Sequence, residues 1–222
     1  LVGDVLSHVA LPGIGLALLL SLDPIYGAAA FLLAAAFGTW LLEKKTALPP
    51  EAIIGTFFTA TLALGVILVP NENLFESLFG NLFAISFSDA VFIIVVSLII
   101  FILTILISRR LTLGIVAPDL ARSIGQRPDL AYLSFLLLFA LSVALGIKLI
   151  GSVLMGALTI LPAVSARNFS WSLKSFLSFS VFLGLLMTGL GIFISSAFHF
   201  TPGPTVILTG LVFFIISLLL KK

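Results

Sequence analysis

The sequence has no cysteine and very little charge, and each absence excludes a class of protein. Without Cys there is no disulfide, thiolate metal site or iron–sulfur cluster, so any bound metal must use nitrogen or oxygen ligands. Charged residues make up 9% of the 222 residues and apolar residues 61%, whereas a typical globular protein has about 25% and about 45–50%. So few charges cannot cover a water-exposed surface. The composition therefore predicts an integral membrane protein.

Long apolar runs divide the chain into candidate membrane spans, each of which needs about 20 mainly apolar residues. The runs are uniformly apolar rather than alternating with a period of two, which favours helices over barrel strands. We therefore expect an all-α polytopic membrane bundle of about eight transmembrane helices, in a single domain over residues 1–222. The predicted spans are 5–22, 25–42, 52–69, 90–107, 130–147, 149–166, 175–197 and 205–220.

The positions of the cations predict the orientation, because cytoplasmic loops of membrane proteins carry an excess of Lys and Arg. With the N-terminus inside, ten of the eleven Lys and Arg residues fall in cytoplasmic segments and only Lys148 falls outside. The C-terminus is then cytoplasmic, and we expect Lys148 to extend along the span to the interface. Because the cations are scattered in ones and twos, the basic net charge does not indicate a nucleic-acid partner.

Two connections are predicted to have structure of their own. Residues 70–89 carry Leu and Phe at amphipathic helical spacing, which predicts an interfacial helix on the outer leaflet. Residues 108–129 form the longest cytoplasmic connection, and a Pro and a Gly frame a short helix within it. This short helix is either plain surface structure or a contact with a soluble motor protein. Its residues are Pro118, Asp119, Leu120, Ala121, Arg122, Ser123, Ile124 and Gly125.

Asp4 and His8 are the candidate metal ligands, because ionisable side chains in or beside a span are costly and are candidates for function. Their i, i+4 spacing places them on one face of a helix, about 6 Å apart between Cβ atoms. A carboxylate and an imidazole at this spacing can hold one divalent cation. The structural alternative is that Asp4 caps the helix and His8 hydrogen-bonds within the bundle.

One chain supplies only two ligands, whereas a zinc site usually takes three or four from the protein. Two copies of the pair about a two-fold axis would supply four, so a metal site here implies a homodimer.

The sequence has no P-loop, no Gly-x-Ser-x-Gly motif and no clustered catalytic carboxylates. We therefore predict no enzymatic activity in this chain, and ATP hydrolysis must take place on another polypeptide. His199, alone in a loop, is expected to be solvated.

Several segments, in order along the whole chain, resemble the membrane permeases of ABC importers for zinc and manganese. The Gly-Asp-x-Leu-Ser-His and Leu-Pro-Gly residues of Gly3–Gly13 carry the most specific part of the resemblance. Asp119–Gly125 is similar to the family's loop that contacts the ATPase. The remaining matching segments are Leu78–Leu82, Gly151–Ala163 and Pro202–Thr205.

The resemblance implies a type II importer fold in a prokaryotic inner or plasma membrane, with no permanently bound cofactor. It implies a second permease copy, a cytoplasmic ATP-binding subunit and an extracytoplasmic metal-binding protein as partners. The family's pathway Asp and His correspond to Asp4 and His8. Family members begin with a further transmembrane helix and a basic pair before the Gly-Asp motif, so we expect an N-terminal helix to be missing here.

The favoured function is import of a divalent cation, zinc first and manganese second. Imidazole favours zinc and carboxylate oxygen suits manganese, so one ligand of each kind leaves the metal open. One alternative is an ABC permease for a metal chelate or corrinoid, which would need a wide, aromatic-lined pathway. A self-contained secondary metal transporter would need more ionisable residues deep in its spans. A membrane hydrolase would need a third ligand or a nucleophile beside the pair.

Overall fold

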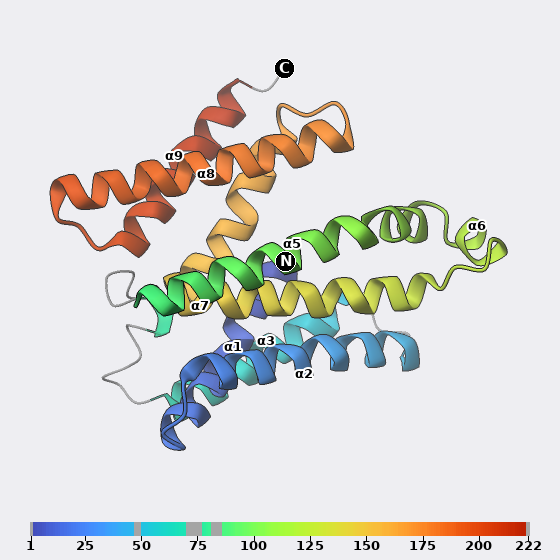
Figure 1. Cartoon of the computed structure of the whole chain (residues 1–222), viewed down its shortest axis with the longest axis horizontal. Coiled ribbons are helices and arrows are strands. Elements are labelled where there is room, and N and C mark those ends of the chain that lie inside the picture. The colour runs from blue at the N-terminus through green and yellow to red at the C-terminus, as the bar shows by residue number, and fades with distance from the viewer. Residues whose placement is uncertain (1, 47–49, 70–76, 81–85, 221–222) are drawn as a thin grey trace.

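The computed structural model of this chain describes residues 2–46, 50–69, 77–80 and 86–220, and these residues form helices and loops without any strand. The predicted all-α fold is confirmed. The helices are α1 (Val2–Leu19), α2 (Pro24–Lys45), α3 (Pro50–Leu68), α5 (Phe87–Val116), α6 (Pro118–Ser123), α7 (Pro128–Arg167), α8 (Leu173–Phe198) and α9 (Pro202–Leu219) (Figure 1).

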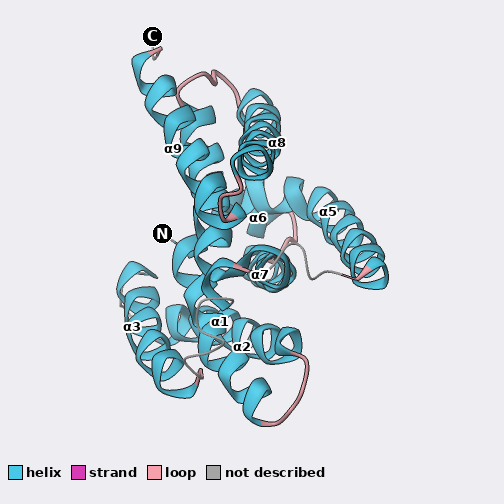
Figure 2. Ribbon diagram, turned by 90° about the vertical axis from the view of Figure 1, so that its left-hand side faces the viewer, coloured by secondary structure: helices cyan, strands magenta, loops and turns pink. Residues whose placement is uncertain are grey.

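Helix α7 is the centre of the fold. It contacts α1 and α2 as well as α5, α8 and α9, and Figure 2 shows α1–α3 on one side of it and α8 and α9 on the other. The largest buried cluster lies where α1, α2 and α7 meet, and it includes Leu32, Ala140 and Val143. Small residues such as Ala are common in this cluster, because they let helix backbones approach closely inside a membrane.

The spans predicted over 130–147 and 149–166 form one element, α7, which is broken at Gly151 rather than turned at Lys148. Gly151 has φ 75° and ψ 169°, a conformation that glycine adopts easily because it has no Cβ. Helix α7 has 40 residues, and a straight helix of that length would measure about 60 Å, twice the thickness of a hydrocarbon core. The break redirects the chain, and Figure 1 shows its second part running towards α8 and α9.

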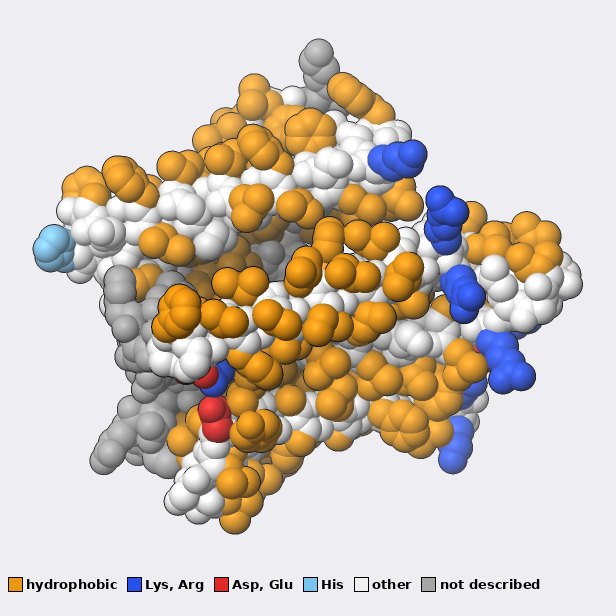
Figure 3. Space-filling model, viewed as in Figure 1, with side chains coloured by type: hydrophobic (Ala, Val, Ile, Leu, Met, Phe, Trp, Pro, Cys, Tyr) orange, Lys and Arg blue, Asp and Glu red, His pale blue; other side chains and the backbone are white. Residues whose placement is uncertain are grey.

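The predicted count of eight transmembrane helices is not confirmed. Five of the described helices, α2, α5, α7, α8 and α9, are individually long and apolar enough to cross a membrane, and two shorter apolar helices are His8–Leu19 and Gly55–Leu68. Helix α5 has 30 residues and buries only Ile93 and Ile100. Apolar side chains cover the exposed face of this helix in Figure 3. Such a surface is suited to lipid rather than to water.

Polar side chains at the ends of the helices satisfy backbone N–H groups that have no partner within the helix. The Asp23 carboxylate accepts a hydrogen bond from the backbone N–H of Ile25 at 3.0 Å, and Pro24 opens α2. At α5, the Ser86 hydroxyl accepts from the backbone N–H of Asp89 at 3.2 Å. These caps agree with the chain breaks from which the spans were predicted.

Most of the interfacial helix predicted over residues 70–89 lies outside the described residues. Of the described parts, residues 86–89 form the cap and first turn of α5, and residues 77–80 pack against the protein. A Cβ built on Gly80 would lie 2.5 Å from the carbonyl carbon of Ile150, and one built on Gly203 would lie 2.9 Å from the carbonyl oxygen of Phe79. This segment therefore touches both the break in α7 and the start of α9.

We predict that Gly27→Ala destabilises the protein, because α1 and α2 cross with their backbones in contact at this residue. A Cβ on Gly27 would lie 2.7 Å from the carbonyl carbon of Gly13 and 2.8 Å from the Cβ of Ala17. Overpacking of this kind costs about 1–3 kcal/mol. Thermal unfolding in detergent should show a lower midpoint for Gly27→Ala. The matched control is Gly189→Ala in α8, where a Cβ meets no atom of the described structure within 4 Å. Equal midpoints for the two variants would contradict the close crossing.

Candidate metal site and coupling helix

Helix α1, which carries the predicted metal ligands, is held on three sides. It packs against α2, α3 and α7, and the side chains of Val9, Ala10 and Leu11 are completely or almost completely buried. Pro12 lies inside the helix and is buried as well. Because proline has no N–H, it cannot donate the helical hydrogen bond to the carbonyl of residue 8. The helix is therefore weakened one turn after His8.

His8 lies at the edge of the buried part of α1. Its side chain is partly buried, and its ring packs edge-on against the ring of Phe58 from α3, with centroids 5.4 Å apart and planes at 72°. This contact holds the imidazole between α1 and α3. A partly buried His8 in contact with Phe58 suits both of the roles predicted for it, a ligand on the transport pathway and a packing residue.

Asp4 belongs to the same helix, four residues before His8, but its side chain lies outside the described part of the structure. Coordination of a metal by the pair therefore stays a prediction. Within the described residues, no group of three or more His, Asp and Glu side chains comes together in a way that could hold a metal ion. The described part of one chain therefore does not by itself build a three-ligand site.

A second charged group, which the sequence analysis missed, joins three helices at the opposite end from α6. Lys148 donates to the carboxylate of Asp89 at 2.8 Å and to that of Asp23 at 3.2 Å. Asp23 caps α2 and Asp89 lies in the first turn of α5, whereas Lys148 lies in α7, three residues before its break. Lys148 thus does not simply extend to the interface, because it pairs with both carboxylates. The sequence contained a signal for this group, because Lys148 was the one cation predicted on the outer side and Asp23 and Asp89 lie at the predicted outer ends of their spans.

The predicted short helix between the fourth and fifth spans is present as α6, from Pro118 to Ser123. Ala121 of α6 is fully buried, whereas Leu120 and the C-cap residue Ile124 are more than half exposed. Gly125 follows with φ +77°, so it ends the helix in a left-handed conformation that a side chain would strain. The helix therefore presents apolar side chains at the tip of the hairpin formed by α5 and α7 (Figure 1).

Lys and Arg side chains gather at the end of the molecule that carries α6 (Figure 3). There, Lys44 of α2 pairs with Asp129 of α7 at 3.3 Å and lies over the ring of Trp40 at 4.3 Å. The Trp40 indole N–H donates to the backbone carbonyl of Asp129 at 3.0 Å. These contacts join α2 to the start of α7 at the basic end.

His199 follows the last residue of α8, where it ends that helix in a left-handed conformation with φ 58° and is exposed.

Comparison with known proteins decides the family. Residues 1–221 match the model of the ABC 3 transport family. The chain belongs to this family. The solved structure of PsaBC from Streptococcus pneumoniae in complex with Fab superposes on the chain with a TM-score of 0.82 at 30% identity, covering 97% of this chain and 79% of that one. The resemblance to zinc and manganese ABC permeases, inferred from the motifs, is confirmed.

Curated members of the ABC 3 transport family are similar along nearly the whole chain. The manganese import system permease protein ScaB of Streptococcus parasanguinis is 33% identical, over 98% of this chain and 79% of its own length. The high-affinity zinc uptake system membrane protein ZnuB of Haemophilus influenzae is 28% identical, over 99% of this chain and 86% of its own length. Manganese is named more often than zinc among such relatives. The names therefore do not support the predicted preference for zinc.

We predict that Lys148→Ala lowers the midpoint of thermal unfolding in this ABC 3 family member, because it leaves Asp23 and Asp89 near each other without the cation between them. Lys148→Arg, which keeps the charge, should lose less. Lys174→Ala is the matched control, since Lys174 is exposed and has no ion pair within the described chain.

The loss should shrink when Lys148→Ala is made in an Asp89→Ala background, because contacting residues give non-additive effects. Strictly additive losses would show that Lys148 and Asp89 do not interact in the folded protein.

Proposed function

We propose that this chain is the membrane permease of an ATP-driven importer that translocates a divalent metal cation, manganese or zinc. The observation that carries this proposal is the family match over residues 1–221, in a chain with Asp4 and His8 one turn apart on the buried helix α1. No other motif of the sequence supplies ligands for a dication. The chain itself hydrolyses no ATP in this proposal, because that reaction takes place on a separate cytoplasmic subunit.

The permease acts as a homodimer in this proposal, with the ion on the two-fold axis. Two copies of Asp4 and His8 would supply two carboxylates and two imidazoles, which is enough to replace much of the hydration of a dication. The pair would hold the ion transiently, since transport requires release as well as binding. An extracytoplasmic metal-binding protein would deliver the ion to the end of the bundle opposite α6, and the ion would leave at the basic, cytoplasmic end.

Two findings speak for a metal ion rather than a chelate or corrinoid. Helix α1 is surrounded by α2, α3 and α7, and its segment after His8 is almost completely buried, as at Val9 and Leu11. This close packing suits an ion better than a large ligand.

A self-contained secondary transporter would have to couple transport through its own ionisable residues, and the described spans bury no carboxylate or amine completely. Family membership favours the ATP-driven mechanism.

Helix α6 is the proposed contact with the ATP-binding subunit. Its exposed Leu120 and Ile124 lie at the tip of the α5–α7 hairpin, and the cations around it support a cytoplasmic location for this end by the positive-inside rule. On this orientation the C-terminus is cytoplasmic too. The contact would transmit the movement of the ATPase to α5 and α7, the two helices that α6 connects.

We predict that Asp4→Ala and His8→Ala each abolish most metal uptake while the protein stays in the membrane. Asp4→Ala would leave two neutral imidazoles, which cannot compensate a dication in a medium of low dielectric constant. His8→Ala would leave two carboxylates, so selectivity should shift towards harder cations such as manganese. The measurement is uptake of radioactive manganese and zinc into cells, normalised to the amount of protein in the membrane.

The matched control for His8 is Phe58→Leu, which removes the ring contact of His8 but none of its nitrogen atoms. This variant should keep most of the uptake. Wild-type uptake by the Asp4→Ala, His8→Ala double variant would overturn the ligand assignment. The reconstituted complex with its ATPase distinguishes the metals, because the transported ion should stimulate ATP hydrolysis more than the other.

We predict that Gly125→Val uncouples ATP hydrolysis from transport. Valine is strained at φ +77°, so the end of α6 must shift, although no atom of the described structure lies within 4 Å of the added Cβ. Basal ATP hydrolysis of the reconstituted complex should remain, whereas its stimulation by metal and the uptake should fall at least tenfold. Gly55→Val in α3, where a Cβ also meets open space, is the control. Normal coupling in Gly125→Val would exclude α6 as the contact.

A further inference from the structure

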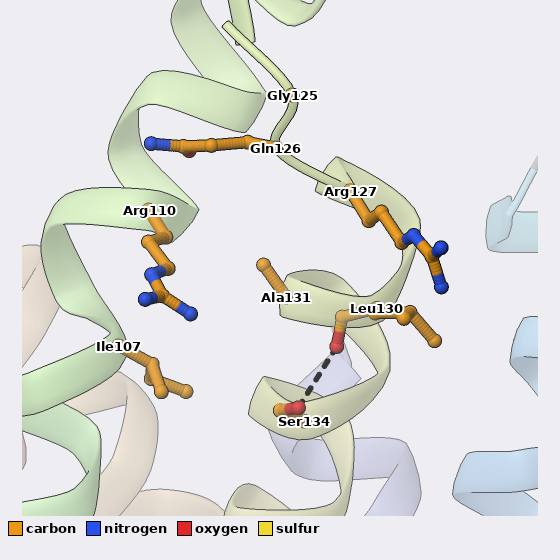
Figure 4. A pocket seen from close by; sticks show the side chains of 8 residues that line it. All are labelled: Ile107, Arg110, Gly125, Gln126, Arg127, Leu130, Ala131 and Ser134. Atoms are coloured by element: carbon orange, nitrogen blue, oxygen red, sulfur yellow. Dashed lines mark hydrogen bonds between the residues drawn. The ribbon is translucent and has the colours of Figure 1, made fainter. Parts of the chain in front are cut away.

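A cavity of about 420 Å³ opens between α5 and α7 beside the loop that follows α6. Figure 4 shows that Arg110 and Gln126 extend into the space between the two helices, whereas the guanidinium of Arg127 points away from it. The cavity therefore has one charged donor inside and a second cation at its rim. Its lining residues are Ile107, Arg110, Gly125, Gln126, Arg127, Leu130, Ala131 and Ser134.

The cavity is positively charged and lacks an internal counter-ion. Within the described chain neither Arg110 nor Arg127 forms an ion pair, and the Glu43 carboxylate near this end accepts a hydrogen bond from the Tyr132 hydroxyl. Asp129 pairs with Lys44 and Asp119 pairs with Arg122. The N-terminus of α7 lies at the rim, where Pro128 begins the helix, and it adds a partial positive charge. The site is therefore built to accept an anion.

The depth of the cavity in the membrane follows from the length of α5. Asp89 and Arg110 both lie in this helix, and their separation of 21 positions corresponds to about 31 Å. This is close to the roughly 30 Å thickness of the hydrocarbon core of a bilayer. With the Asp89–Lys148 ion pair taken as one interface and α5 as parallel to the membrane normal, Arg110 lies near the other interface. Helix α6 begins eight residues beyond Arg110 and so lies further out, where a soluble partner can reach it.

An exposed apolar strip leads from the cavity into the membrane. Leu106, Leu103 and Ile99 lie four, seven and eleven residues before Arg110, which places them on the same face of α5. Their exposed fractions are 67%, 42% and 50%. The strip from Arg110 to Ile99 is about 16 Å long, close to half of the roughly 30 Å hydrocarbon core, which is the depth that the acyl chains of one leaflet fill. A charged head site thus continues directly into an acyl-chain surface.

We propose that this cavity binds an anionic phospholipid from the leaflet at the α6 end, with the phosphate on Arg110 and one acyl chain along the strip on α5. Gln126 would donate its side-chain amide to the phosphate or glycerol oxygens. The Ser134 hydroxyl donates to the backbone carbonyl of Leu130 at 2.8 Å, so it can still accept a hydrogen bond from the headgroup. A basic cavity between membrane helices at a cytoplasmic interface is a known type of site for anionic lipid headgroups.

The test is native mass spectrometry of the complex with its ATPase, after addition of dioleoylphosphatidylglycerol, dioleoylphosphatidylcholine or inorganic phosphate. The variant is Arg110→Gln, and the matched control is Arg109→Gln. Arg109 has the same charge at nearly the same depth and is exposed, but it lies about 100° around the helix and does not line the cavity. Arg110→Lys keeps the charge and tests whether a loss comes from unfolding.

We expect phosphatidylglycerol to stay bound to the wild type and to Arg109→Gln, and its occupancy to fall about fivefold in Arg110→Gln. Arg110→Lys should retain most of the occupancy, and phosphatidylcholine should not replace the anionic lipid. Equal losses in Arg109→Gln and Arg110→Gln would overturn the proposal, since they would show only a diffuse basic interface. Displacement of the lipid by inorganic phosphate would identify a free anion as the ligand. Loss of the ATPase from Arg110→Gln with unchanged lipid would identify a protein contact instead.

Discussion

The close backbone contact between Gly80 and Gly151 is the constraint around which the bundle is arranged. A Cβ on Gly151 would lie 2.5 Å from the backbone nitrogen of Gly80, so the connection before α5 can touch the break in α7 only because both residues are glycine. Inside a membrane, irregular backbone is tolerated where protein surrounds it. Helix α7 can therefore change direction at this point, and α8 and α9 pack on its second part.

Charge determines how the helices are placed along the membrane normal. At one end, Lys148 joins the first turns of α2 and α5 to α7. At the other end, Lys44 joins the last turn of α2 to the start of α7. The helices thus share two levels at which charged side chains meet, and the segments between them are apolar. Individual pairs of this kind contribute little to stability when they are exposed, but they specify which helix ends lie at the same level.

The sequence predicted the helical class, the break between the first two spans at Asp23, and the short helix α6, because composition, apolar run length and Pro–Gly framing are local signals. It did not predict the break at Gly151 in its correct place. A turn at Lys148 was expected from charge alone, whereas the break depends on contact with Gly80, 71 residues away in the chain. The pairing of Lys148 with two carboxylates was missed for the same reason. At the candidate metal site, the spacing of Asp4 and His8 came from the sequence, whereas the contact of His8 with Phe58 requires the packing of α1 on α3.

The α5–α7 hairpin connects the two ends of the molecule as a unit. Ile93 and Ile100 of α5 pack against Leu145 of α7, and the Lys148–Asp89 pair ties the same helices near the break. At the other end, α6 joins them through only a few residues. If α6 moves as proposed, separating α5 from α7 would expose the side chains buried in this apolar contact. In the proposed coupling the displacement would pass to the end where Lys148 meets Asp23 of α2, and α2 packs on α1, the helix that carries Asp4 and His8.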